Sequence, residues 1–394
     1  MGIVIPIILV IISCLIIWRA SDGFAAASDY IGRHLSEGVR GATINAIGSS
    51  LPELFTSLFF LFYLKDVDGF SGGIGTTAGS AIFNSMIIPA FVILVVVFTG
   101  VATHIKVSRK VIRRDGFALI IAELIFIMLI SGSKLDWWHG FLLMIIYVIY
   151  LVYMFSTMKK INIIHPHHVG DMRLHGSEQK GFLQALFTFD LHRLIIGNKD
   201  MNPVNSWVLL AISTIWIAFV CLVLVQACEW IGSDTYTIPY IGTFSGLNIP
   251  IMFVAVILAS AASSVPDTIL SMNDARKGNY DDAISNALGS NIFDICFAMG
   301  FPLFLYTLIH GPILMQDETI DLSGELRMLL LILTVLAFSV YVFRKNINQV
   351  QAYLLLAIYF IFTLYVIGRG ANNELAHDVA VYLREMVSYL NLFQ

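Results

Sequence analysis

Long apolar runs follow one another along the chain, separated by short polar segments. About 20 apolar residues are enough for a helix to cross the hydrocarbon part of a bilayer. This pattern predicts ten spanning helices, at residues 2–19, 38–64, 72–100, 116–132, 137–158, 206–230, 249–272, 283–309, 327–343 and 350–368. The predicted fold class is therefore an all-α polytopic membrane protein with ten transmembrane helices.

The composition agrees with a membrane location. Hydrophobic residues make up 58% of the chain and charged residues 13%, whereas soluble domains carry roughly 25% charged residues. The first apolar run has neither a preceding basic segment nor a following small-residue cleavage motif, so we expect a retained span rather than a signal peptide. The lipid bilayer is an expected partner. The net charge of −4 gives no indication of nucleic-acid binding, and the oligomeric state is not predicted.

The basic residues predict the orientation. Of the 23 lysines and arginines, 18 lie in the connections after odd-numbered spans. Because cytoplasmic loops carry an excess of these residues, we expect the odd-numbered connections to be cytoplasmic and both termini to lie outside. Short loops and the lack of a targeting signal favour the plasma (inner) membrane.

The longest connection divides the chain into two halves. The predicted organisation is a first five-helix membrane repeat at 1–158, a cytoplasmic loop at 159–205, a second five-helix repeat at 206–368 and a short tail at 369–394. We expect the loop to be solvated, with a short helix within 181–187, and the tail to form an amphipathic helix. A metal site is the alternative interpretation of the loop histidines, for which we expect a solvated polar loop; these are His165, His167, His168, His175 and His192. The cysteines lie in apolar segments without the spacing of a metal site; these are Cys14, Cys221, Cys228 and Cys296.

Two short motifs recur in the same order in the two halves. GSSLPELFTS at 48–57 is repeated as ASSVPDTILS at 262–271, and GTTAGSAIFNSMIIPAF at 75–91 as SNALGSNIFDICFAMGF at 285–301. The first copies occupy spans two and three, and the second copies spans seven and eight. With five spans in each half, the second half is inserted upside down. Inverted repeats with interrupted helices at equivalent positions are typical of secondary transporters.

Each copy of the first motif places a proline and an acid inside an apolar span. Pro52 has no N–H, so the carbonyl of Gly48 loses its helical partner; Pro266 does the same to the carbonyl of Ala262. An unpaired carbonyl in hydrocarbon is unfavourable unless it lines a wet cavity or binds a ligand. A cation is a suitable ligand.

The four segments together supply oxygen ligands only. The candidate ligands are the side chains of Glu53, Asp267, Asp294, Asn84, Ser49, Ser50, Ser80, Ser263, Ser264 and Ser290 and the carbonyls of Gly48 and Ala262. Calcium takes six to eight oxygens, and the lack of cysteine or histidine argues against zinc or copper. Three buried carboxylates need cations, so sodium, calcium and protons can compete for them. We expect no resident cofactor and no enzymatic activity.

These residues also have other interpretations. A single acid or serine in a span is often structural, and we expect this of Glu123 and Glu229, which have no counterpart in the other half. An intramembrane aspartyl protease also needs two buried carboxyls, but it does not need four serines and an inverted partner. A calcium channel is a further alternative, and uncoupled calcium conductance would distinguish it from an antiporter.

At these motifs the chain resembles the sodium/calcium exchanger superfamily, whose two inverted repeats each carry G/A-x-S-x-P-E/D. The resemblance covers about 38–95 and 252–305. It implies an antiporter in which Glu53 and Asp267 bridge calcium, Asn84 and Asp294 complete the sodium arrangement, and spans one and six slide to switch access.

The resemblance leaves the coupling ion open. RGATINAIGSSLPELFTS and GSNIFDI resemble the potassium-dependent branch, in which an acid at the position of Asp294 is associated with potassium transport, whereas SVPDT resembles potassium-independent members. The predicted function is sodium/calcium exchange. The alternative is exchange of calcium or another divalent cation for protons, because carboxylates can also carry protons.

Overall fold

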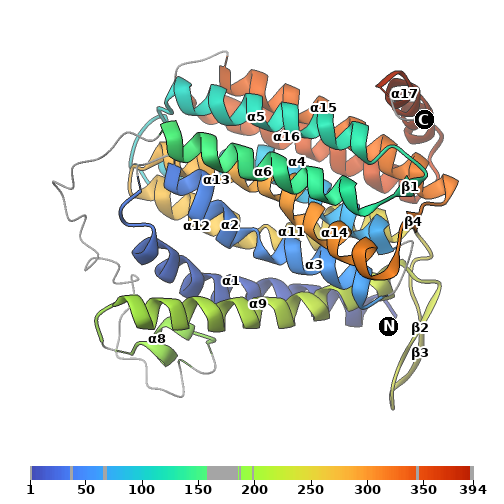
Figure 1. Cartoon of the computed structure of the whole chain (residues 1–394), viewed down its shortest axis with the longest axis horizontal. Coiled ribbons are helices and arrows are strands. Elements are labelled where there is room, and N and C mark those ends of the chain that lie inside the picture. Colours follow the sequence, from blue (N-terminus) through green and yellow to red (C-terminus); the bar gives the residue numbers. More distant parts are fainter. Residues whose placement is uncertain are drawn as a thin grey trace.

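The computed structural model describes residues 2–35, 39–64, 69–157, 185, 188–197, 199–342 and 346–390. It is predominantly helical (Figure 1). In the first half the helical elements are α1 (Val4–Ile31), η1 (Gly41–Asn45), α2 (Ala46–Ser49), α3 (Leu51–Phe62), α4 (Gly69–Phe98), α5 (Arg109–Leu129) and α6 (Trp137–Thr157). In the second half they are α8 (Leu191–Ile195), α9 (Pro203–Gly232), α10 (Ile251–Val254), η2 (Ala255–Ala259), α11 (Ser260–Ser263), α12 (Val265–Arg276), α13 (Tyr280–Phe293), η3 (Asp294–Ala298), α14 (Gly300–His310), α15 (Asp317–Val342), α16 (Gln349–Gly370) and α17 (Glu374–Leu390).

Most of the predicted spans correspond to long apolar helices. Within the described residues, seven helices are long and apolar enough to cross a membrane, and two bent pairs bring the number to nine. The chain is therefore a multi-pass membrane protein. The remaining predicted span corresponds to α5, which is more polar because it carries four charged residues beyond its first turn: Arg113, Arg114, Asp115 and Glu123. The count of ten stays a prediction.

Two helices are longer than the apolar runs that predicted them. α1 continues to Ile31 instead of ending at 19, and α15 begins at Asp317 instead of 327. The added turns contain charged residues, which interrupt the apolar pattern, but several of these residues have partners in the folded chain. In α15, for example, Glu325 pairs with Arg369 at 2.8 Å. The apolar run therefore gives a lower limit for helix length.

Both termini lie at one end of the helical bundle (Figure 1). The same end carries two small antiparallel pairs: β1 (Lys134–Leu135) with β4 (Ile313–Leu314), and β2 (Thr235–Ile238) with β3 (Gly242–Ser245). These strands lie in the connections after predicted spans four, six and eight, so the arrangement agrees with an even number of crossings. Which side of a membrane this end faces remains a prediction.

The apolar core has two parts. The larger part is formed mainly by α4, α5, α6, α13, α14, α15 and α16. The smaller part lies between α1 and α9, which run side by side along one edge of the molecule (Figure 1), and α9 also contacts α3. The pair α1 and α9 is thus packed as a unit against the rest of the bundle.

The repeat seen in the sequence is also present in the backbone. A π-helical turn of 5 residues, a helical segment of 4 and a helix of 12 follow one another in η1–α2–α3, and again in η2–α11–α12. The two breaks fall at Ser50 and Ser264, where the helices bend by 43° and 40°. Both breaks lie two residues before a proline, as expected from the missing N–H and the proline ring.

Two glycines let the halves interlock. A Cβ on Gly79 of α4 would lie 2.3 Å from the backbone oxygen of Val256 in η2. A Cβ on Gly289 of α13 would lie 2.7 Å from the Cα of Ala42 in η1. Gly79 and Gly289 are the glycines of the repeated Gly-Ser-x-Ile-Phe motif. Each half therefore places this helix against the π-helical turn of the other half.

Several predictions concern the loop and the tail. The short helix expected within 181–187 and the side chains of His165, His167, His168 and His175 lie outside the described residues. His192 belongs to α8. The predicted tail helix is present as α17, which packs against α15 and α16. The domain boundaries stay predictions.

The glycine contact leads to a stability prediction. We expect Gly79→Ala to lower the apparent melting temperature of the purified protein in detergent, because overpacking against backbone costs about 1–3 kcal/mol. Gly73→Ala is the matched control on α4, since its Cβ would lie 3.7 Å from the nearest atom, an ordinary contact. Equal melting temperatures for the two variants would contradict the interlock.

Candidate cation-binding site

The two breaks bring the polar segments of both halves to one place. Pro52 and Pro266 lie in the first turns of α3 and α12, directly before Glu53 and Asp267. The recorded backbone bonds across the first break run from Ser50 N–H to the carbonyl of Ala46 and from Leu54 N–H to that of Ser50. Among the described residues, no backbone N–H donates across the breaks to the carbonyls of Gly48 or Ala262. The predicted release of these two carbonyls agrees with the geometry.

Glu53 accepts hydrogen bonds from both halves. Its Oε1 accepts from the hydroxyl of Ser80 in α4 at 3.0 Å and from that of Ser264 at the second break at 3.3 Å. The two hydroxyls lie 2.9 Å from each other. Ser80 and Ser264 come from different halves, so the carboxyl joins them at the centre of the bundle.

Asp267 has a corresponding environment. Its Oδ1 accepts from Ser290 of α13, in its own half, and from Ser49 of α2, in the other half. The amide of Asn286, also on α13, lies 3.4 Å from the same oxygen. Each of the two motif carboxyls is thus held by a serine of its own half and a serine of the opposite half.

Ser80 connects Glu53 to the third carboxyl. Its hydroxyl lies 2.9 Å from Oδ2 of Asp294, at the start of η3, and accepts from the amide of Asn84 at 3.2 Å. One hydroxyl cannot donate to every acceptor around it at once. The arrangement around Ser80 therefore depends on which neighbouring oxygens are protonated or bound to a cation.

The site contains buried oxygens that have no partner among the described residues. Five side-chain oxygens are of this kind: Oγ of Ser50, Oε2 of Glu53, Oδ1 of Asn84, Oδ2 of Asp267 and Oδ1 of Asp294. Buried polar atoms in native proteins are normally paired, so a cluster of unpaired acceptors indicates a missing positive partner. Within the described part of the chain, none of the three carboxyls forms a salt bridge. A cation would supply this missing charge.

The carboxyls alone do not form a metal cluster. In the described ranges, no three His, Cys, Asp or Glu side chains come close enough to hold one metal ion. The hydroxyl, amide and carbonyl oxygens are therefore needed to complete a coordination shell. Such a set suits a hard cation such as sodium or calcium.

The site is closed to solvent in this conformation. The side chains of all ten predicted ligands are buried, and Ser49, at 3%, is the most exposed. An ion held here would exchange with solvent only after neighbouring helices move. The burial is what separates this site from a surface cluster of acids.

Ser263 is placed differently from the other predicted ligands. Its hydroxyl donates back to the carbonyl of Ser260 at 3.1 Å. This is the usual role of a lone serine in a membrane helix. The same hydroxyl also faces the carboxyl of Glu53, so Ser263 stays among the candidate ligands.

Asn286 belongs to the site, although the sequence interpretation did not include it. Its amide lies between Asp267 and Ser271, with 2.9 Å to the hydroxyl of Ser271. A signal was present, because Asn286, Ser290 and Asp294 follow at intervals of four residues. The equivalent residue of the first half, Thr76, donates to the carbonyl of Gly72 instead.

A second layer of contacts fixes α4 against α13. The amide of Asn291 donates to the carbonyl of Ala81 at 2.9 Å and to the hydroxyl of Ser85 at 2.7 Å. The phenol of Tyr341 in α15 donates to the carbonyl of Ser85. Asn291 and Ser85 directly follow Ser290 and Asn84 in the chain, so these contacts hold the backbone that carries the site.

The two acids that we expected to be structural lie outside the site. Glu123 of α5 is buried and accepts from the hydroxyl of Thr334 in α15 at 2.7 Å. Glu229 of α9 accepts from the amide of Gln226. Neither shares a recorded hydrogen bond with Glu53, Asp267 or Asp294.

The sequence of this chain is similar to a family profile and to known exchangers. The profile of the family described as sodium/calcium exchanger protein matches residues 5–156 and 205–368. Human sodium/potassium/calcium exchanger 5 is 28% identical over 86% of this chain and 78% of its own length. Mouse sodium/potassium/calcium exchanger 4 is 24% identical over 70% of this chain and 66% of its own.

A solved structure has the same overall fold. The sodium-calcium exchanger NCX_Mj, soaked with 2.5 mM Na⁺ and 0.1 mM Ca²⁺, matches 91% of this chain and 97% of its own chain, with a TM-score of 0.53 and 20% identity. The family profile covers most of both halves, including all four motif segments. This chain therefore belongs to the sodium/calcium exchanger family.

Proposed function

We propose that the chain exchanges sodium for calcium across a membrane by alternating access to the site around Glu53 and Asp267. The observation that carries this proposal is the set of five unpartnered buried oxygens contributed by both halves. Three of them belong to carboxyls that have no recorded cationic partner. A site of this kind is unfavourable when empty and favourable when it holds cations.

The donor set fits both proposed ions. Calcium takes six to eight oxygens, and the five unpartnered side-chain oxygens together with the carbonyls of Gly48 and Ala262 supply that number. Glu53 and Asp267 would bridge calcium. Asn84 and Asp294 would complete the arrangement for sodium. The names of the two exchangers similar to this chain, which mention sodium, potassium and calcium, agree with these ions.

Coupling follows from charge. Two or more sodium ions, or one calcium ion, would neutralise the same carboxylates, so the two kinds of ion compete. Moving the unloaded site across the membrane would leave carboxylates buried without counter-ions, which is strongly unfavourable. The protein therefore changes its access side mainly when it is loaded, and this gives exchange rather than leakage.

We propose ten spans in two inverted five-helix repeats as the framework for this exchange. The matching lengths of η1–α2–α3 and η2–α11–α12 support the inverted repeat. The separate packing of α1 and α9 along one edge supports a sliding of this pair over the remaining helices. Such a movement would expose the site alternately to the two sides.

Calcium uptake into proteoliposomes tests the coupling ion. Purified protein in sodium-loaded proteoliposomes is expected to take up radioactive calcium when diluted into sodium-free medium. Potassium is added or omitted outside, and a parallel series uses a pH gradient in place of the sodium gradient. Dependence on potassium would assign potassium to the oxygens around Asp294. Uptake driven by the pH gradient alone would contradict sodium exchange and favour calcium/proton exchange.

Neutral variants of the two motif acids separate a transport role from a structural role. Glu53→Gln or Asp267→Asn should lower calcium exchange by roughly a hundredfold, because loss of a buried charge contact of about 3 kcal/mol changes an equilibrium by that factor. In cation-free buffer, neither variant should lower the apparent melting temperature, since each removes an unpaired buried charge.

Asp282→Asn is the control for that experiment. Asp282 is also buried, but its carboxyl lies 2.6 Å from the guanidinium of Arg40. Its neutralisation leaves Arg40 with a weaker partner and should lower the melting temperature. Exchange that persists in Glu53→Gln or Asp267→Asn would rule out the proposed ligands.

The contribution of Asn286 to calcium exchange is tested by removing its amide. Asn286→Ala removes the amide beside Asp267, and we expect a roughly two- to tenfold loss of calcium exchange, the range of one hydrogen bond. Thr76→Val is the matched change at the equivalent position of the first half, where the side chain bonds within its own helix. A loss of the same size in both variants would argue against a specific role for Asn286.

A further inference from the structure

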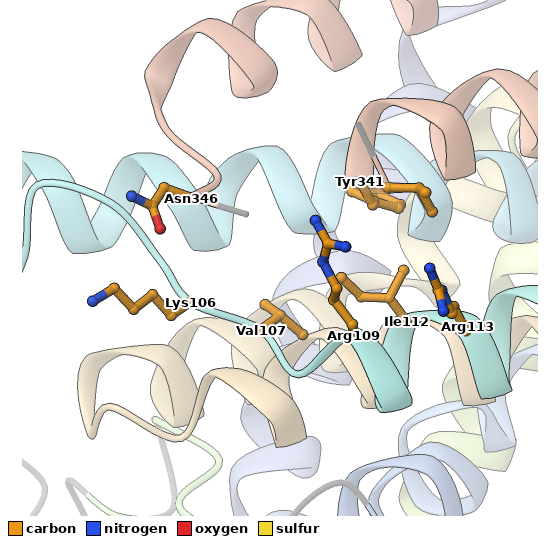
Figure 2. Close-up of a pocket in the computed structure, with 8 residues that line it drawn as sticks. Lys106, Val107, Arg109, Ile112, Arg113, Tyr341 and Asn346 are labelled. Carbon is orange, nitrogen blue, oxygen red and sulfur yellow. The ribbon is translucent and has the colours of Figure 1, made fainter. Parts of the chain in front are cut away.

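A cavity of about 380 Å³ lies away from the candidate cation site, between the start of α5 and the end of α15. It is lined by Lys106, Val107, Arg109, Ile112, Arg113, Tyr341, Val342 and Asn346 (Figure 2). Its size is within the usual range of ligand pockets, roughly 300–1,000 Å³. The lining combines three cationic side chains with an apolar wall.

The cationic side chains of the cavity are not neutralised by neighbouring acids in the part of the chain that the structure describes. Among the described residues, Lys106, Arg109 and Arg113 form no salt bridge, whereas the neighbouring Arg114 binds Asp115 at 2.6 Å. The nearby acid Asp281 accepts from the backbone N–H of Ser108 at 2.7 Å, at the start of α5. The cavity therefore has an excess of positive charge.

The two arginines lie on the same side of the cavity. Arg109 and Arg113 are four residues apart and so lie on one face of α5. Figure 2 shows both side chains on the side of Tyr341, with Lys106 and Asn346 toward the other end of the cavity. Guanidinium groups bind phosphate oxygens in pairs, and the positive end of the α5 dipole adds to the attraction.

The position of the cavity indicates a lipid. Further along the same two helices, Phe117 and Leu336 are exposed apolar side chains, at 55% and 45%, as expected for a lipid-facing surface. The cavity lies beyond this surface, at the helix ends where headgroups would lie. We propose that the cavity binds a phosphate group, with the headgroup of an anionic phospholipid as its source and a free phosphate ion as the alternative source.

The cavity is close to the backbone that carries the cation site. Tyr341, which lines it, donates to the carbonyl of Ser85, and Ser85 follows Asn84 in α4. A lipid bound against Tyr341 would thus lie next to a residue that positions α4. The proposal itself concerns binding and does not depend on which ions the protein transports.

The test uses the full chain in detergent and native mass spectrometry. Phosphatidic acid is titrated as the probe, diacylglycerol serves as the same lipid without phosphate, and inorganic phosphate is a third arm. Arg109→Gln and Arg113→Gln are each expected to weaken phosphatidic acid binding about tenfold, the effect of one charge-assisted hydrogen bond. Lys110→Gln removes the same charge from the same helical turn outside the cavity, and should leave binding unchanged.

The outcomes distinguish the sources. Binding of phosphatidic acid, but not inorganic phosphate, with loss in the two arginine variants supports a lipid headgroup site. Binding of inorganic phosphate with the same dependence on Arg109 and Arg113 supports a site for the free ion. Equal loss in Lys110→Gln, no loss in the arginine variants, or equal binding of diacylglycerol would overturn the proposal.

Discussion

The burial of three carboxyl groups without a cationic side chain is the constraint on which the rest of this structure depends. Glu53, Asp267 and Asp294 are fully buried, and each keeps one oxygen without a recorded partner. Other buried acids have a cationic partner, as Asp282 has Arg40 and Glu325 has Arg369, and the buried Glu123 lies alone rather than in a cluster. The contrast indicates that the charge balance at the centre comes from outside the chain. This is the physical basis for a protein that moves cations.

The helix breaks follow from the same constraint. A continuous helix would use its carbonyls internally and would hold its acid on the side of an intact cylinder. The proline after each serine pair ends this pattern, bends the helix and leaves carbonyls available beside the carboxyl. Glycines at 79 and 289 then let the opposite half approach closely enough for its serines to reach these acids. The apolar bundle around them keeps the three carboxyls away from solvent in this conformation.

Much of this arrangement could be predicted from the chain itself. The apolar runs located the long helices, and the repeated motifs identified the two breaks and the residues around them. These signals are local, because hydropathy, proline chemistry and motif spacing act over a few turns. The ends of α1 and α15 were missed for the same reason. Charged residues stop an apolar run, but they do not stop a helix when a distant residue such as Arg369 supplies a partner.

The sequence by itself determined the membrane class, the repeat and the identity of most oxygens at the candidate site. Only the tertiary structure decided how those oxygens are shared. It placed Ser80 between Glu53 and Asp294, turned Ser263 back to its own helix and added Asn286 beside Asp267. Two equivalent positions, Asn286 and Thr76, have different partners because contacts across the bundle are not repeated as the motifs are. Periodicity fixes which face a residue occupies, whereas its partner depends on which other helix meets that face.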